Sequence, residues 1–305
     1  MVDFHTHSNI SDGDLSPEML IKEAVKQGLR AIALTDHDTI SGLESAKTAA
    51  LAQNIHFIPG IEVNISWRGS KSVSGLGPGG EFHLLGLGIN KPSPAFITAI
   101  DELSRRREAR NYEILNKMHE LSLIPSIETA AEELKTILTG KKQNKNIDIN
   151  PISGNSLGRL HFAALLIKLN IVRNIDQAFS RYLGAGKPLF VPKEGMQFEE
   201  AAALIRESGG ISVLAHPNSL YVAWGRFPDL AKTLKDMGLM GLEAWHPTAK
   251  AGYCLRLEAL AKSLGIYITE GSDFHGFIRP GSRLGYSGKR RKISDAILEA
   301  IPELT

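Results

Sequence analysis

Seven short apolar segments, rich in β-branched residues, alternate along the chain with longer stretches of helical periodicity. This alternation is typical of βα units and predicts a mainly parallel sheet, because neighbouring strands that run in the same direction need a crossover between them. The predicted strands are Val2–His5, Ala31–Thr35, Phe57–Val63, Phe82–Ile89, Ile211–Ala215, Gly241–Ala244 and Tyr267–Thr269. We therefore expect an α/β fold.

The alternation breaks between about Ser93 and Val191, where a long amphipathic helix and shorter helical segments take its place. This break predicts three parts: a first barrel part at 1–98, a helical insertion at 99–191 and a second barrel part at 192–305. Two polar or glycine-rich stretches, at Gly69–Gly80 and Gly140–Asn155, are predicted to be exposed loops.

Composition narrows the class of protein. No apolar run approaches the ~20 residues of a membrane span and nothing resembles a signal peptide, so we expect a cytoplasmic protein. A single cysteine, Cys254, excludes an internal disulfide, and we assign it no role. The formal net charge of +2 is too small for a long nucleic-acid footprint, but it is compatible with a small phosphorylated ligand.

Polar side chains of one chemical kind follow the predicted strands. A single histidine is more often structural than functional, but imidazoles and carboxylates recur at or just beyond the carboxyl ends of the strands, where functional residues of barrels converge. The candidate metal ligands are His5, His7, Asp12, His37, Glu62, His83, His216, Asp273 and His275.

Imidazole and carboxylate ligands in this mixture suit Mn²⁺, Fe²⁺ or Zn²⁺. Nine candidate ligands exceed the needs of one ion, so we expect two or three divalent ions. Neighbouring divalent ions activate water near neutral pH and stabilise both oxygens of an in-line displacement at phosphorus. The residues therefore predict hydrolysis of a phosphate ester.

Five motifs then carry a family resemblance: HTHSNISDG, LTDHD, GIEV, AHP and GSDFH, in that order. The chain resembles the PHP (polymerase and histidinol phosphatase) superfamily, and most closely its stand-alone branch of 3',5'-nucleoside bisphosphate phosphatases and short-RNA 5'-exonucleases. The resemblance implies a distorted (β/α)7 barrel with an α-helical insertion that caps the substrate. It also implies a nucleotide or a short RNA as substrate.

The resemblance further implies how nine ligands serve three ions. His5, His7, Glu62 and Asp273 would hold the first ion and the metal-bridging water or hydroxide that acts as nucleophile. The other ions would be held by Glu62, His83 and His216, and by Asp12, His37 and His275. We expect Asp36 and Asp38 to orient His37, and we assign no metal role to His246, which also follows a predicted strand.

The insertion contains GRLHFA at Gly158–Ala163, which is similar to the segment of the family that binds phosphate. Arg159 and His161 would bind the substrate phosphate, since a guanidinium group matches a pair of phosphate oxygens. Lys187, in the downstream RYLGAGKPLFV, is a further candidate for substrate binding. Three alternatives stay open at this point: a histidinol-phosphatase-like phosphomonoesterase, an amide hydrolase and a non-catalytic metal-binding module.

Overall fold

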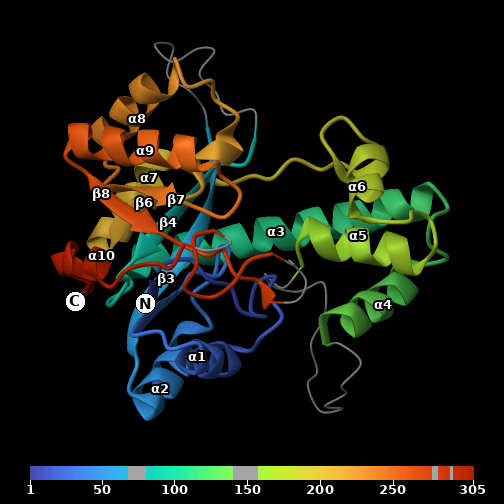
Figure 1. Cartoon of the computed structure of the whole chain (residues 1–305). Coiled ribbons are helices and arrows are strands. Elements are labelled where there is room, and N and C mark those ends of the chain that lie inside the picture. Colours follow the sequence, from blue (N-terminus) through green and yellow to red (C-terminus); the bar gives the residue numbers. More distant parts are fainter. Residues whose placement is uncertain (68–79, 140–156, 277–280, 289–290) are drawn as a thin grey trace. The chain divides into compact units, whose positions relative to one another are not determined.

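The computed structural model describes residues 1–67, 80–139, 157–276, 281–288 and 291–305 (Figure 1). The polar loop predicted at Gly140–Asn155 lies outside these residues, as does the glycine-rich loop at Gly69–Gly80 apart from Gly80 itself. The chain divides into two compact units, one formed by 1–101 with 195–305 and the other by 102–194. Among the helices of the described residues, none has the length and apolar character needed to cross a bilayer.

The described part of the first unit is built on one sheet of eight strands. Seven of them follow the order β1-β2-β3-β4-β6-β7-β8, and β5 pairs with β3. A parallel bridge between Thr6 and Phe274 joins the two ends of this order, so the sheet nearly closes into a barrel. The prediction of an α/β barrel with seven strands around it is confirmed. The strands are β1 (Val2–Asp3), β2 (Ala31–Leu34), β3 (His56–Ser66), β4 (His83–Leu87), β5 (Met196–Gln197), β6 (Ile211–Leu214), β7 (Gly241–Trp245) and β8 (Tyr267–Glu270).

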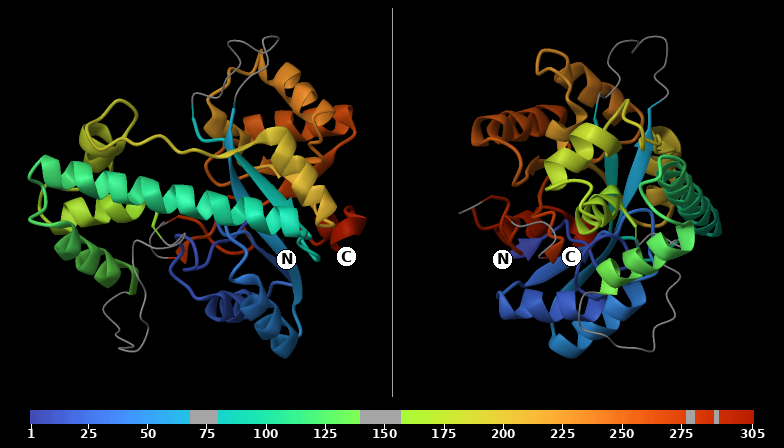
Figure 2. Two further views of the ribbon diagram at one scale, coloured as in Figure 1. Left: turned by 180° about the vertical axis from the view of Figure 1, so that it is seen from behind. Right: turned by 90° about the vertical axis from the view of Figure 1, so that its right-hand side faces the viewer.

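One strand departs from the parallel arrangement. Strand β4 is antiparallel to both neighbours, β3 and β6, and Figure 2 shows β3 and β4 side by side. We expected the ligands to follow the carboxyl ends of strands, and for His83 this was wrong, because His83 is the first residue of β4. Its reversed direction places the start of β4 beside the end of β3, where His83 pairs with Asn64.

Helices cover the outside of this sheet, with α1 and α2 beside the first strands and α9 beside β7 and β8 (Figure 1). Helix α1 begins after Ser16, whose side chain accepts a hydrogen bond from Met19 N, and it buries Leu20, Ile21 and Ala24. The bounds are α1 (Pro17–Lys26), α2 (Leu43–Gln53), α7 (Phe198–Glu207), η3 (Pro217–Leu220), α8 (Phe227–Asp236), α9 (Ala251–Leu264), α10 (Ala296–Glu299) and η5 (Pro302–Leu304).

The described part of the second unit is helical. Helix α3 begins in the first unit and continues into the second, which has a hydrophobic core of its own around Leu115, Leu134 and Phe162. Its helices are α3 (Pro94–Glu120), α4 (Ile127–Thr139), α5 (Arg159–Lys168), α6 (Ile175–Ala178) and the π-helix η2 (Phe179–Leu183). A separate core means that this unit can keep its shape independently of the barrel.

Candidate metal centre

All nine candidate ligands of the sequence lie buried in the first unit and are at most 8% exposed. His5, His7 and Asp12 follow β1, His37 follows β2, and Asp273 and His275 follow β8. The remaining ligands are Glu62 within β3, His83 at the start of β4, and His216 after β6. The structure thus gathers side chains from six strands at one edge of the sheet.

The carboxylate of Glu62 lies at the centre of this cluster. Its Oε1 is 2.8 Å from His83 Nδ1 and 2.8 Å from His216 Nε2. Its Oε2 is 3.1–3.2 Å from nitrogens of three further imidazoles, those of His5, His7 and His37. A single carboxylate within reach of five imidazoles has the geometry of a bridge between ions.

His5 and His7 point their Nε2 atoms at each other, 3.1 Å apart. Asp273 Oδ1 lies 3.5 Å from the first of these atoms and 3.4 Å from the second. Ligand atoms about 2.1 Å from one ion are separated by roughly 3.0–3.4 Å in octahedral or tetrahedral geometry. These three side chains therefore have the spacing that a shared metal ion would impose.

Asp12, His37 and His275 form the other end of the cluster, with Asp12 Oδ1 3.2 Å from His275 Nε2. Three buried atoms here, Asp12 Oδ1, His37 Nδ1 and Glu62 Oε2, make no well-aligned hydrogen bond. Buried polar atoms of this kind are costly unless another partner satisfies them. The donor set and these atoms fit divalent ions.

Among the described residues, four groups have ligand atoms within 4.8 Å of one another. They share His5, His7, His37 and Glu62, so neighbouring ions would share ligands or lie close together. The groups are His7, Asp12, His37 and His275; His5, His7 and Asp273; His5, Glu62 and His216; and His37, Glu62 and His83.

The electrostatics of the cluster favour cations. Burial alone would raise the pKa of Glu62, but His37 and His5 outweigh it and hold this pKa well below its ordinary value. Burial would likewise lower the pKa of His7, but hydrogen bonds to Asp273 and Glu62 raise it to about 9. In the metal-free protein Glu62 is therefore ionised, and a proton on His7 offsets part of its charge.

Sequence reasoning missed Glu243, a fully buried residue of β7. Its Oε1 lies 2.9 Å from His5 Nδ1, and its Oε2 accepts a hydrogen bond of 2.6 Å from the backbone N–H of His216. The contact between Glu243 Oε1 and His5 Nδ1 fixes the proton of His5 on Nδ1 and leaves Nε2 available to a metal. A glutamate between Leu242 and Ala244 in an apolar strand was the available signal.

Gly271 provides the room for this contact. A Cβ atom on Gly271 would lie 2.3 Å from His5 Cβ and 2.4 Å from Glu243 Oε1, so no larger residue fits without displacement. Asp3 was missed as well. It accepts hydrogen bonds from the backbone N–H groups of His5 and Ser272, and burial raises its pKa to about 6. Asp3 thereby holds the two ligand-bearing segments together.

Two of the candidate ligands have backbone conformations that L-residues rarely adopt, His216 with φ 28° and Asp273 with φ 49°. Left-handed backbone at non-glycine residues persists only where the surroundings enforce it, and it is concentrated at functional sites. For His216 the surroundings include the hydrogen bond to Glu243, and for Asp273 they include His246.

Three residues near the ligands can now be placed. His246 Nε2 lies 3.1 Å from Asp273 Oδ2, so His246 contacts a ligand and belongs to none of the four ligand groups. The expectation that Asp36 orients His37 was wrong. Asp36 instead accepts hydrogen bonds from Ser8 and Ser11 and holds the turn after His7. Asp38 accepts hydrogen bonds from Asn64.

The candidate phosphate-binding residues lie in the second unit, at the start of α5. Arg159 is half-buried, with its guanidinium carbon 5.7 Å from the centre of the Phe179 ring. His161 is buried, and its Nδ1 accepts a hydrogen bond of 3.1 Å from Gly158 N. Lys187 is exposed in a turn after η2. Arg159 and His161 both lie in the first turn of α5, two positions apart.

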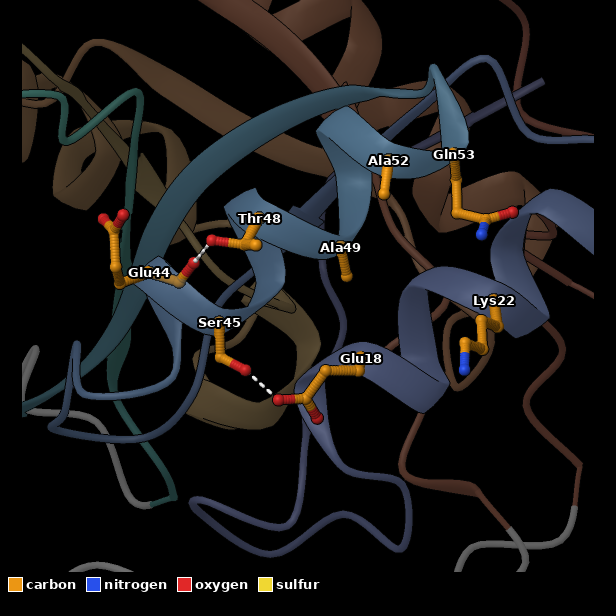
Figure 3. A pocket seen from close by; sticks show the side chains of 8 residues that line it. All are labelled: Glu18, Lys22, Glu44, Ser45, Thr48, Ala49, Ala52 and Gln53. Carbon is orange, nitrogen blue, oxygen red and sulfur yellow. Dashed lines mark hydrogen bonds between the residues drawn. The ribbon is translucent and has the colours of Figure 1, made fainter.

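A separate surface pocket of about 450 Å³ lies between α1 and α2 (Figure 3). None of the nine candidate ligands lines it. Its lining residues are Glu18, Lys22, Glu44, Ser45, Thr48, Ala49, Ala52 and Gln53.

Comparison with known proteins places the chain in a family. The family model described as PHP domain matches residues 3–160. A 5'-3' exoribonuclease of Haemophilus influenzae is 31% identical over 92% of this chain and 93% of its own length. A 3',5'-nucleoside bisphosphate phosphatase of Chromobacterium violaceum is 28% identical over 94% of this chain and 91% of its own length. A solved structure described as an amidohydrolase of Chromobacterium violaceum, with bound sulfate and no metal, has a TM-score of 0.74 at 27% identity and covers 90% of this chain and 87% of its own.

The barrel, the clustered ligands and these relatives define a metal-binding hydrolase that acts on phosphoric ester bonds. The predictions of an enzyme and of phosphate-ester hydrolysis are confirmed. The chain belongs to the PHP domain family, as the motifs predicted.

Proposed function

We propose that the chain hydrolyses phosphate esters of nucleotides, either nucleoside bisphosphates or short oligonucleotides, with three divalent ions in the cluster around Glu62. The observation that carries the proposal is the Glu62 carboxylate, which reaches five imidazoles with both of its oxygens. The named activities of two relatives, an exoribonuclease and a nucleoside bisphosphate phosphatase, support the class of substrate.

The ions would be Mn²⁺, Fe²⁺ or Zn²⁺, because these accept mixtures of imidazole and carboxylate. His5, His7, Glu62 and Asp273 would hold the first. The second would bind Glu62, His83 and His216, and the third Asp12, His37 and His275. Three ions also account for the overlap of the four ligand groups, since Glu62 serves more than one.

When bound, the ions supply an activated water and stabilise the charge on the phosphate oxygens. The protein's own residues prepare for this. Glu62 keeps the imidazoles turned toward common points, Glu243 holds the proton of His5 on Nδ1, and Asp36 fixes the turn after His7. These contacts set the positions of the ligand atoms before the substrate binds, so little reorganisation accompanies the reaction.

We assign substrate binding to Arg159, His161 and Lys187, and a capping role to the helical part at 99–191, with the barrel formed by 1–98 and 192–305. The guanidinium plane of Arg159 matches two phosphate oxygens, and the ring of His161 is held by Gly158 N. The substrate that follows is a small phosphorylated molecule.

The test is hydrolysis of nucleotide substrates by the purified protein loaded with Mn²⁺, read out as inorganic phosphate or as mononucleotide. We expect release of inorganic phosphate from nucleoside 3',5'-bisphosphates, or release of mononucleotides from short RNA. Excess chelator should abolish the activity. Histidinol phosphate and an acyl amide serve as competing substrates in the same assay. No turnover of any nucleotide, or preferred turnover of either competitor, would contradict the proposal.

A further inference from the structure

Tyr221 is unusually exposed for a large aromatic residue, at 81%, and it follows the ligand His216 by five positions. It ends η3, the short helix that leaves the carboxyl end of β6, with φ 53° in the left-handed region. A tyrosine is strained in this conformation, so neighbouring contacts must hold it. The exposed position of Tyr221 is therefore fixed by specific contacts of its turn.

The contacts that hold this turn include the ligand itself. His216 Nδ1 lies 2.7 Å from Ser219 Oγ, which donates to the carbonyl of Glu81 at 2.8 Å. Ser219 Oγ therefore accepts a hydrogen bond from the N–H at Nδ1 of His216, and His216 Nε2 faces Glu62. In return, Glu81 N donates to Ser219 O at 3.0 Å. The turn that carries Tyr221 is thus tied to a metal ligand on one side and to the segment before His83 on the other.

The ring of Tyr221 rests against the backbone of Gly80. A Cβ on Gly80 would lie 2.5 Å and 2.8 Å from ring carbons Cδ2 and Cε2, so only a glycine lets the ring approach this closely. One part of the ring is therefore supported by the chain that leads to His83, and the rest is open to solvent.

A second segment at the same edge of the sheet continues this surface. Asn218 Nδ2 donates to Thr248 Oγ1 at 3.0 Å, which joins the turn after β6 to the turn after β7. Helices α8 and α9 follow these turns and lie side by side (Figure 1). Both turns leave carboxyl ends of strands, as do most of the metal ligands.

The two segments bring aromatic rings and a cation together. The ring of Trp224 is 5.5 Å from that of Tyr253, and the guanidinium carbon of Arg256 lies 5.6 Å from the centre of the Trp224 ring. Trp224 and Tyr253 are half-buried, and Arg256 is exposed. We call these three residues, together with Tyr221 on the turn shortly before Trp224, the aromatic rim.

We propose that the aromatic rim binds the bases of a short single-stranded oligonucleotide whose phosphate is cleaved at the metal cluster. This inference rests on the proposed function and extends it to recognition of the base. Aromatic side chains next to arginine bind single strands by stacking, with little preference among bases because each base has a π-face. A rim of this kind favours an oligonucleotide over a phosphate ester without a base.

The test compares Michaelis constants of Tyr221→Ala for two substrates, a 5'-phosphorylated tetraribonucleotide and ribose 5-phosphate. One lost stack corresponds to about fivefold or more in affinity. We expect KM for the tetranucleotide to rise at least about fivefold more than KM for ribose 5-phosphate, with kcat for the tetranucleotide little changed. Tyr221→Trp should restore the wild-type KM because the indole ring also stacks. Arg256→Ala should change KM in the same direction as Tyr221→Ala.

Leu255→Ala is the matched control, because Leu255 is 58% exposed on α9 and lies outside the rim; it should leave both constants unchanged. The inference is overturned if Tyr221→Ala and wild type have the same KM for the tetranucleotide, or if both substrates lose affinity equally. Failure of the proposed function looks different, since wild type would then hydrolyse neither a nucleoside bisphosphate nor a short oligonucleotide.

Discussion

Oε1 of Glu243 lies 2.9 Å from Nδ1 of His5, and both residues are fully buried. The second oxygen of the same carboxylate binds the backbone N–H of His216 at 2.6 Å. One side chain outside the four groups thus positions two candidate ligands, His5 and His216, that lie far apart in the sequence.

Glu243→Gln should weaken metal binding by about 10–100-fold, the range for partners that orient metal-ligating histidines. An amide presents one donor and one acceptor, so it cannot accept from both His5 and His216. The measurements are the metal content and the rise in Tm on adding Mn²⁺. Both should be smaller in Glu243→Gln than in wild type. Glu258→Gln, on α9, is the control and should bind ions like wild type. A normal Mn²⁺-induced rise in Tm for the first variant would contradict this role.

Gly271→Ala should lose metal and stability together. The added methyl group would overlap His5 and Glu243, and overpacking of this kind costs about 1–3 kcal/mol. Gly252→Ala is matched in chemistry and should be neutral or slightly stabilising, because nothing lies within 4 Å of its Cβ position. Urea unfolding with and without Mn²⁺ separates the two effects. Equal stabilities of the two variants would refute the steric argument.

Metal binding should release protons. Nearby carboxylates raise the pKa of His7 to about 9 in the metal-free protein, so this ring is protonated at pH 7, and they raise the pKa of His5 well above its ordinary value. A divalent ion binds only the deprotonated ring, so metal affinity should fall as pH is lowered. Titration calorimetry of Mn²⁺ binding in buffers of different ionisation enthalpy measures this release, because the observed binding enthalpy changes with the buffer in proportion to the number of protons released. An observed enthalpy that is independent of the buffer would contradict the expectation.

Arg159→Ala and His7→Ala should both reduce activity, but for different reasons. The arginine lies in the second unit and is assigned to phosphate, so its loss should raise KM with the metal content intact. The histidine lies in the metal cluster, so its loss should remove metal as well as activity. Metal analysis beside steady-state kinetics distinguishes the two. Arg181→Ala controls for the loss of an arginine from the same unit.

Much of this architecture could be read from the chain alone. Alternating apolar segments located all seven strands of the barrel order, and the polar residues after them fall into one cluster, because parallel strands end at a common edge. The direction of β4 could not be read, because an apolar run has the same pattern in either direction. Glu243 escaped notice because its partners, His5 and His216, are distant in sequence. The contacts of Asp36 depend on a turn, which short motifs do not specify.

The bridge between Thr6 and Phe274 has a consequence for synthesis of the protein. His5 and His7 are made more than two hundred residues before Asp273, which belongs to the same group of candidate ligands. A nascent chain therefore carries these two histidines without a complete cluster until Asp273 has been made. Chains that end before Gly271 should accordingly bind fewer ions than the chain of residues 1–305.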